Sequence, residues 1–472
     1  MLAGLGAPLV IGHAEPADGS PAGGPGTLLS WTPAEALLPA DAYARGGDLT
    51  RGGLVDVSCP TTAWCGAVGY FDDTTATRQG LLAAWNGSRW STKQAPQPAG
   101  GTGTVNLSSI SCPAAGWCAA VGQYDDASAT QQGILLVLAD GSWSATEAPL
   151  ITPADPADVE LLSVACAGPG SCVAVGRYQS SDPADGAPPL VETLAGGAWT
   201  PSVPGLPATT GTDPQSLLTS VACPTTTWCE AVGQLQSVVG STETYSGLAE
   251  RLSPGVSSAA VLTLARAVGP PAPAPDPVIP DPQVACGAVG TCVAVADYPV
   301  AGGARVGVVA ALEAGGWKVR AAPLPATAAG TADTTLVAVA CGTATGCTAV
   351  GGYGTAAGPA PLIETWARRA WTAQPGPVPA GASGPAGLDG VSCRSAKVCV
   401  AVGQDTVGPF ADGPLVEQLS TTWQAEAPGL PTSAAPGSAG LTAVSCAGPS
   451  VCAGVGQYQD TGGDGQGLFE TS

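Results

Sequence analysis

Cysteine is the residue type in this chain whose number and spacing point most directly to chemistry. All 16 cysteines fall into eight pairs of the form Cys-x5-Cys. The pairs are Cys59 with Cys65, Cys112 with Cys118, Cys166 with Cys172, Cys223 with Cys229, Cys286 with Cys292, Cys341 with Cys347, Cys393 with Cys399, and Cys446 with Cys452. An even number of cysteines at a regular spacing indicates a disulfide framework, which forms in an oxidising compartment. We therefore expect eight local disulfides in a secreted or cell-surface protein.

Zinc binding and free thiols are the alternatives for these cysteines. A tetrahedral zinc site takes four thiolate or imidazole ligands, usually from more closely spaced cysteine pairs. Here five residues separate the two cysteines, and the single histidine, His13, precedes the first pair. The pattern therefore favours disulfides over zinc. It also excludes histidine-based acid–base chemistry within the repeats.

Carboxylates are the second group of side chains that could bind a ligand. The chain has 36 Asp and Glu against 15 Lys and Arg, which gives a net charge of -21. Nucleic acids and anionic lipid surfaces need basic residues, so this charge argues against both. Acidic residues gather in the segments that follow the second cysteine of a pair. The six that form our candidate binding face are Asp72, Asp73, Asp125, Asp126, Asp182 and Asp460.

Calcium is the one cofactor that these acids bring into consideration. Ca²⁺ takes six to eight oxygen ligands, and adjacent carboxylates such as Asp72 and Asp73 could supply some of them. The sequence has no Asp-x-Asp-x-Asp-Gly loop. We therefore expect solvated acidic loops without a cofactor, and we assign no catalytic, metal-binding or cofactor-binding residue.

The cysteine pairs also mark a repeat of about 55 residues. In the first repeat, three short β segments cover residues 55–59, 65–70 and 81–85, and a fourth starts at Trp90. Turn-forming residues, among them Asn86 and Gly87, separate the segments. Four strands in a unit of about 50 residues are typical of a β-propeller blade.

The two ends of the chain predict how the repeats close. The last repeat ends at residues 467–472, which match a third strand, so it lacks a fourth. Trp31 lies eight residues before Pro39, and Trp90 in a fourth strand lies eight residues before Pro98. We therefore expect an N-terminal strand to complete the last blade, which would remove an exposed sheet edge.

The expected fold is thus all-β, with a single eight-bladed β-propeller of four-stranded blades over residues 27–472. Residues 1–26 combine a short apolar run with a stretch rich in Gly and Pro. We interpret them as a truncated signal segment followed by a flexible linker.

The order Val-Ser-Cys, turn, Trp-Cys-x-Ala-Val-Gly, loop, apolar strand, Gly-x-Trp resembles the Asp-box repeats of sialidase-like propellers. The cysteine pair in every repeat resembles a variant found in secreted bacterial repeat proteins. The Asp-box-like pieces are residues 86–90, 140–143, 196–199 and 315–317. The resemblance implies the propeller fold, with the Asp-box as a structural turn between the third and fourth strands.

The resemblance also sets an expectation for catalysis. A sialidase of this family holds a carboxylate with three arginines, and the arginines here do not map onto that triad. Six tyrosines are expected to share one repeat position and to be structural. They are Tyr70, Tyr124, Tyr178, Tyr298, Tyr353 and Tyr458.

The functional prediction follows from the two faces of such a disc. The disulfides clamp the first turn of each blade, so the longer acidic loops of the opposite face are the expected binding surface. We expect a non-catalytic binding or scaffold module for a carbohydrate or a protein. The alternatives are a sialidase-like glycoside hydrolase or lyase, and a structural envelope protein without a specific ligand. We expect a monomer that neither binds nucleic acid nor inserts into a membrane.

Overall fold

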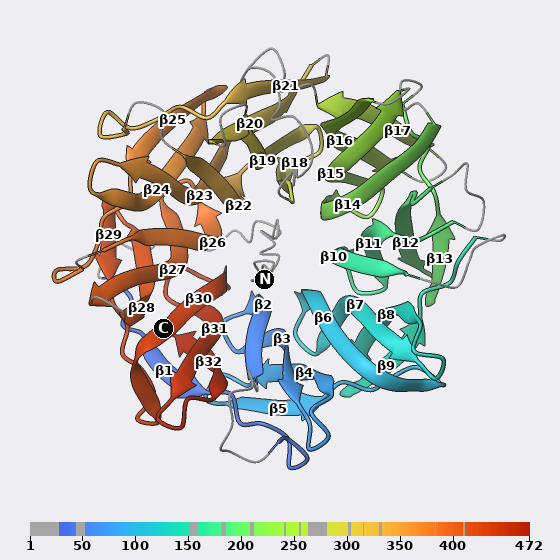
Figure 1. The fold of residues 1–472 in the computed structure, drawn as a ribbon, viewed down its shortest axis with the longest axis horizontal. Helices are drawn as coiled ribbons and strands as arrows, with labels where there is room; N and C mark the ends of the chain where they lie inside the picture. The colour runs from blue at the N-terminus through green and yellow to red at the C-terminus, as the bar shows by residue number, and fades with distance from the viewer. Residues whose placement is uncertain are drawn as a thin grey trace.

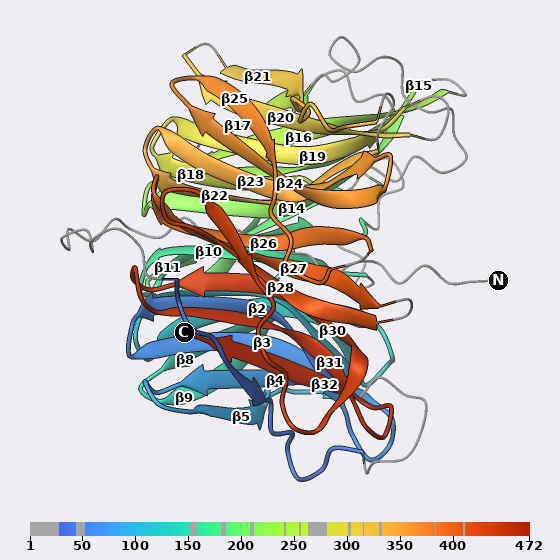
Figure 2. The same cartoon turned by 90° about the vertical axis from the view of Figure 1, so that its left-hand side faces the viewer.

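The computed structural model describes residues 28–43, 52–151, 158–180, 186–207, 212–239, 242–253, 256–262, 281–300, 304–314, 316–329, 333–382, 384–408 and 411–472. Within these ranges, β-strand is the only regular secondary structure of any length. The strands form sheets that surround a central axis like the blades of a propeller (Figure 1). Seen from the side, the sheets together make a thick disc (Figure 2). The expected all-β class is confirmed.

Each of the first six repeats forms an antiparallel four-stranded sheet whose strand order follows the sequence. The strands are β2 (Gly52–Thr61), β3 (Trp64–Asp72), β4 (Arg78–Trp85) and β5 (Trp90–Gln94); β6 (Gly101–Ala114), β7 (Trp117–Asp126), β8 (Gln131–Ala139) and β9 (Ser142–Glu147); β10 (Glu160–Gly168), β11 (Ser171–Arg177), β12 (Pro189–Ala195) and β13 (Ala198–Ser202); β14 (Thr212–Thr225), β15 (Trp228–Val239), β16 (Thr242–Ser253) and β17 (Val256–Leu262); β18 (Gln283–Ala288), β19 (Thr291–Pro299), β20 (Arg305–Glu313) and β21 (Gly316–Ala321); β22 (Thr334–Thr343), β23 (Gly346–Thr355), β24 (Gly358–Ala367) and β25 (Ala370–Pro375).

The last two repeats share one eight-stranded sheet, in the order β1-β32-β31-β30-β28-β27-β26 with β29 paired to β28. Its strands are β26 (Ala386–Ser395), β27 (Val398–Gly408), β28 (Ala411–Leu419), β29 (Trp423–Glu426), β30 (Ala434–Cys446), β31 (Cys452–Asp460), β32 (Gly465–Thr471) and β1 (Thr32–Glu35). A single parallel bridge, Asp412 to Ser438, joins the two halves.

The N-terminal strand completes the sheet of the last repeat, as the spacing around Trp31 predicts. β1 runs antiparallel to β32, with Thr32 opposite Thr471 and Glu35 opposite Leu468. The first strand of each repeat lies nearest the axis (Figure 1) and contacts the first strand of the next repeat. β2 also contacts β30, β31 and β32, so the first repeat packs against the last.

All eight expected disulfides are present, each across the first hairpin of its repeat. They join Cys59 to Cys65, Cys112 to Cys118, Cys166 to Cys172, Cys223 to Cys229, Cys286 to Cys292, Cys341 to Cys347, Cys393 to Cys399, and Cys446 to Cys452. The Cα atoms of each pair are 3.9 to 4.1 Å apart. The expected local pairing, with no bridge between repeats, is confirmed.

The two faces of the disc differ in the turns that they carry. Because the strands are antiparallel, the first and third turns of a repeat lie on one face. We call this the disulfide face. The second turns and the connections between repeats lie on the other, the loop face.

The Ala-Val-Gly motif after the second cysteine is explained by a β-bulge in the first strand. The register between β2 and β3 shifts between Leu54 and Asp56. A Cβ on Gly69 would lie 2.0 Å from the carbonyl oxygen of Gly53. The same glycine, 1.8 to 2.1 Å from a backbone oxygen, recurs as Gly122, Gly176, Gly233, Gly351, Gly403 and Gly456. The fifth repeat has Ala296 there, and its first strand, β18, begins only at Gln283, after the position of the bulge in the other repeats.

A buried glutamate occupies one position of the third strand in five repeats. These residues are Glu192, Glu250, Glu364, Glu417 and Glu470, and each is 0% exposed. Within the described part of the chain, neither carboxyl oxygen of any of the five has a hydrogen-bond partner. Burial raises the pKa of Glu192, Glu250, Glu364 and Glu470 to about 8 and that of Glu417 well above its usual value. Burial therefore favours the protonated, uncharged form of these side chains.

Candidate functional site

Three of the six candidate acids hold their own loops in shape. Asp73 Oδ1 accepts the backbone N–H groups of Thr75 and Thr77 at 2.8 and 3.1 Å. Although burial opposes it, these bonds and those from the Thr75 hydroxyl and the Gln79 amide lower the pKa of Asp73. Asp126 binds Ser128 and Thr130 in the same way at 2.7 and 3.0 Å, and Asp460 binds Gly462 and Asp464 at 2.8 and 3.0 Å.

The three loops share a sequence signal that the search for acidic clusters missed. Each has the form Asp-x5-Gln-Gly, which ends at Gln79, Gln132 or Gln466. All three glutamines are buried. Gln79 donates to Asp73 Oδ2 at 3.0 Å, and Gln466 donates to Asp460 Oδ2 at 3.2 Å. The Asp–Gln pair therefore braces the second turn in the first and last repeats.

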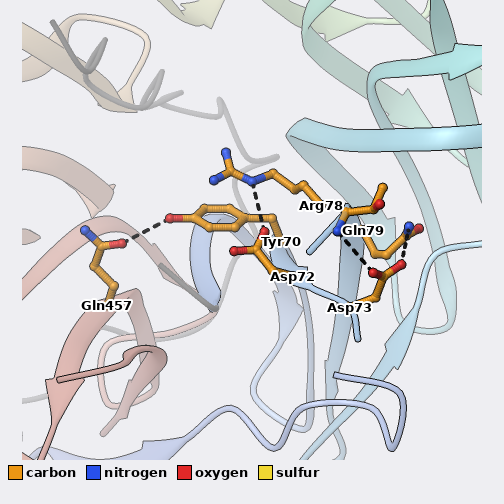
Figure 3. Close-up of polar contacts among 7 residues, drawn as sticks. Tyr70, Asp72, Asp73, Arg78, Gln79 and Gln457 are labelled. Atoms are coloured by element: carbon orange, nitrogen blue, oxygen red, sulfur yellow. Dashed lines mark hydrogen bonds and ion pairs between the residues drawn. The ribbon is translucent and has the colours of Figure 1, made fainter. Parts of the chain in front are cut away.

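Asp72 belongs to a polar cluster between the first and last repeats (Figure 3). Its carboxylate lies 3.7 Å from Arg78, whose guanidinium sits 4.3 Å from the centre of the Tyr70 ring. The Tyr70 hydroxyl donates a hydrogen bond to Gln457 Oε1 at 3.2 Å. Gly53 makes room for this contact, since a Cβ there would lie 2.9 Å from the Tyr70 hydroxyl. Burial raises the pKa of Tyr70 despite the nearby Arg78.

The expectation that Tyr70 shares a repeat position with the other five tyrosines is wrong by one residue. Tyr70 pairs with Gly80 as Gln123 pairs with Gly133, whereas Tyr124 pairs with Gln132. Phe71, which is 0% exposed, fills the buried tyrosine position of the first repeat. A shift of one residue moves a side chain to the other face of a sheet. The Tyr70 side chain therefore projects from the opposite face of its sheet to the other five tyrosines.

The other two candidate acids contribute less to a common site. Asp125 lies on β7 opposite Gln131, and its side chain packs against the backbone of Gly103. Asp182 lies outside the described residues. The structure thus divides the six acids among several loops, and their joint role as a binding face stays a prediction.

The residue five positions after the second cysteine lies at the loop-face end of the second strand, and it is polar in seven of the eight repeats. We call this the rim position. Its residues are Tyr70, Gln123, Arg177, Gln234, Asp297, Gly352, Gln404 and Gln457. Four of the eight are glutamines, which carry a hydrogen-bond donor and an acceptor on one planar group. The sequence search did not select this row because its members differ in type.

A cavity of about 340 Å³ opens beside the rim position of the second and third repeats. We call it the amide pocket. Its lining residues are Gln123, Gln131, Asp158, Glu160, Arg177, Tyr178, Gln179, Ala187 and Gln215. Arg177 Nε donates to Glu160 Oε2 at 3.2 Å, so the one guanidinium in the lining is held in place by a carboxylate.

Carboxylates with raised pKa values lie next along the rim. Burial and the nearby Glu160 raise the pKa of Asp281 to about 6, although the Gln234 amide donates to it at 3.2 Å. Burial also raises the pKa of Asp297, while its ion pair with Arg305 lowers it. Asp297 is thus paired with Arg305, whereas Asp281 has a pKa raised to about 6.

The described residues show neither a metal-ligand cluster nor a candidate membrane helix. Among the residues that the structure describes, no three His, Cys, Asp or Glu side chains come together as ligands for a metal ion. Those residues also contain no helix with the length and apolar character that a membrane span requires. The carboxylates of Asp72 and Asp73 are engaged by Arg78 and by the loop itself, so we propose no Ca²⁺ site there.

The fold and these polar sites define an all-β, propeller-like protein of repeated, disulfide-closed sheets. No protein-family model and no curated protein matches the chain. Among solved structures, it is similar to AofleA from Arthrobotrys oligospora, at 12% identity over 78% of this chain and 95% of that one, with a TM-score of 0.35.

Two further structures are similar to the chain at low identity. The Trypanosoma rangeli sialidase in complex with the inhibitor DANA is 9% identical over 67% of this chain and 56% of that one, with a TM-score of 0.34. A PL25 ulvan lyase is 6% identical over 82% of this chain and 97% of that one, with a TM-score of 0.45. At these scores we draw no functional argument from any of the three.

Proposed function

We propose that the protein is an extracellular eight-bladed β-propeller that binds a carbohydrate without turning it over. Six four-stranded sheets and the two halves of the eight-stranded sheet, joined by one bridge, support the count of eight. The contact of β2 with β30 supports closure of the ring. Sixteen cysteines in eight disulfides support a location in an oxidising compartment.

The observation that carries the proposal is the amide pocket. Four glutamines line it, and an amide can donate to one hydroxyl of a sugar while it accepts from the next. Its volume of about 340 Å³ suits a small ligand, since such sites span about 300–1,000 Å³. The Arg177–Glu160 pair adds fixed donors beside the amides. A lining in which four amides stand beside Asp158, Glu160 and Arg177 is polar throughout, which favours a hydroxyl-rich ligand over an apolar one.

The test begins with a glycan array and continues with calorimetry on the glycans that bind. Gln123→Ala is expected to weaken binding at least ten-fold because it removes a lining amide. Gln424→Ala, which removes an exposed glutamine from the outer strand β29, is the matched control and should leave binding unchanged. Absence of any glycan ligand, or equal loss in both variants, would overturn the proposal.

A second candidate function, glycoside hydrolysis, is favoured by Asp281. A carboxyl group whose pKa is raised to about 6 can act as a general acid near neutral pH, and Glu160 and Asp297 lie close enough to influence it. Hydrolysis predicts turnover of glycosides that declines as the pH rises above about 6. It also predicts that Asp281→Asn lowers this turnover at least 100-fold. A wild-type protein that binds a glycan and leaves it intact excludes the hydrolase.

A further inference from the structure

The turn between β24 and β25, on the disulfide face, has an unusual sequence. Arg368 and Arg369 connect β24 to β25, and the paired residues Ala367 and Ala370 leave only these two in the loop. Both arginines have positive φ angles, 53° and 65°. Two-residue hairpin loops of this kind favour Asn-Gly, Asp-Gly or Gly-Gly, because a side chain opposes positive φ.

Two other repeats show the expected residues at this turn. The second repeat has Asp140 and Gly141 with φ angles of 50° and 76°, and the third has Gly196 and Gly197 with 61° and 85°. The sixth repeat therefore keeps two guanidinium groups where the backbone prefers glycine. Local backbone strain of this kind is typical of sites where the side chains have a function.

The two arginines border a cavity. Its volume is about 480 Å³, and it lies on the disulfide face between the fifth and sixth repeats. Trp366, only 4% exposed, forms part of its inner wall. Thr291 and Thr345 contribute hydroxyl groups to the lining. The cavity thus combines an apolar wall, neutral hydrogen-bonding groups and two cations at its edge.

The electrostatic setting of these arginines differs from that of four other arginines of the chain. Arg78, Arg177, Arg251 and Arg305 each lie within ion-pair distance of a carboxylate. Within the described ranges, neither arginine of the turn forms such a pair. In a chain with a net charge of -21, this leaves two guanidinium groups exposed to solvent together.

Two further basic side chains of the fifth repeat lie outside the lining of the cavity. Lys318 and Arg320 are exposed on β21, the outer strand of the fifth repeat, where they alternate with the inward-packed Trp317 and Val319. Glu313 is the one carboxylate in the lining of the cavity, against the two arginines. The local balance is therefore positive.

We propose that this cavity binds a saccharide that carries an oxyanion, with Arg368 and Arg369 holding the carboxylate or sulfate group. A guanidinium matches such groups with two parallel hydrogen bonds. The cavity is larger than a single inorganic ion requires, and the two threonine hydroxyls suit the neutral hydroxyls of a sugar ring. The site lies on the face opposite the amide pocket and is independent of it.

The test is calorimetric titration of the full chain with three oligosaccharides. They are an oligogalacturonate tetrasaccharide, its uncharged methyl ester and a sulfated galactan tetrasaccharide. At least one charged ligand is expected to bind ten-fold or more tightly than the ester, and the tighter of the two identifies the oxyanion. If no charged ligand binds, or if the ester binds equally well, the proposal is overturned.

Variants of the turn localise the binding. Arg368→Gly with Arg369→Gly reproduces the turn of the third repeat, and Arg368→Asn with Arg369→Gly installs the preferred turn sequence, so both should fold at least as well as the wild type. Each is expected to lose at least ten-fold in affinity for the charged ligand. Arg89→Ala, which removes an exposed arginine from the third turn of the first repeat, is the matched control. Equal loss in this control would show mere charge attraction and would refute the site.

A control on the opposite face separates this site from the proposed function. Gln123→Ala alters the amide pocket and should leave the affinity for the charged tetrasaccharide unchanged. If binding to the charged ligand falls with Gln123→Ala and persists in both turn variants, the ligand occupies the amide pocket and the site between the fifth and sixth repeats is refuted.

Discussion

At the scale of single residues, glycine at the end of the Ala-Val-Gly motif is fixed by the backbone of the neighbouring strand. The bulge in the first strand pushes a carbonyl oxygen into the space where a Cβ would stand. The fifth repeat has Ala296 in place of this glycine, and its first strand, β18, starts after the bulge position of the other repeats. The motif therefore marks a close approach of two strands.

This reasoning predicts the cost of adding one methyl group. In Gly122→Ala, the new Cβ would lie 2.0 Å from the Asn106 carbonyl oxygen, so the strands must separate. We expect a loss of about 3 kcal/mol in the free energy of unfolding. Gly387→Ala is the control, since no atom lies within 4 Å of its added Cβ. Urea denaturation of both variants measures the difference, and similar midpoints would contradict the explanation.

A second prediction concerns the acids that brace the second turns. Asp126→Ala removes the acceptor for the N–H groups of Ser128 and Thr130. Hydrogen exchange at these two amides is expected to quicken about ten-fold, which corresponds to about 1.4 kcal/mol of local stability. Asp125→Ala removes a neighbouring carboxylate outside this network and should leave both amides protected. Faster exchange in the control alone would show that the wrong acid was identified as the brace.

The sequence predicts these residues unevenly, for physical reasons. Cysteine spacing determines the disulfides because a short hairpin brings such pairs together. The braces were mistaken for candidate ligands because an acid that caps a loop has the same sequence signature as an acid that faces solvent. Tyr70 was placed one residue out of register, which in a strand changes the face. The rim position could not be predicted because its residues differ in type and form a row only in the folded disc.

At the scale of the strand, the third strands of five repeats bury a carboxyl group between sheets. The equivalent residues in the other three repeats are Ala83, Leu136 and Ala310. An uncharged acid is tolerated in such a place, but its ionised form loses hydration without gaining a partner. Folding therefore holds the proton on these glutamates at pH values where the unfolded chain has released it.

The direction of the pH dependence follows from this difference. The folded pKa of Glu192 is raised to about 8 by burial, above its usual value of 4.5. Stability from this group is complete below about pH 4.5, declines as the pH rises, and levels off above about pH 8. The thermal midpoint of the protein is thus expected to be higher at pH 5 than at pH 8. A higher midpoint at pH 8 would refute buried, unpaired glutamates.

An isosteric substitution isolates one of these groups. Glu192→Gln removes the titration while it keeps the shape, so the thermal midpoint should rise at pH 8 by roughly 2 °C and change little at pH 5. The control is Glu147→Gln. It alters an exposed glutamate on β9 that accepts a hydrogen bond from the Tyr124 hydroxyl. If the thermal midpoint rises at both pH values, the effect comes from the new amide group and not from the lost titration.

At the scale of the whole molecule, the N-terminal segment connects three repeats. The Gln418 side chain of the seventh repeat binds the backbone of Leu29, accepting its N–H at 2.8 Å and donating to its carbonyl at 3.3 Å. β1 pairs with β32 of the eighth repeat. The Thr92 hydroxyl of the first repeat donates to the carbonyl of Leu37. The position of this segment can be predicted because a tryptophan recurs in fourth strands. Its contacts with the flanking repeats cannot, because no sequence pattern near Trp31 marks them.

The last prediction tests whether this segment holds the two ends of the chain together. Trp31 is 7% exposed and packs with Leu468 and Val416, whereas Leu37 of the same segment is 70% exposed. Trp31→Ala leaves a cavity at the junction and should cost about 3 kcal/mol. It should also speed hydrogen exchange along β32, since β1 then detaches more readily. Leu37→Ala should change neither quantity. Equal thermal midpoints in the two variants, with β32 equally protected, would mean that the sheet of the last repeat is stable without its N-terminal strand.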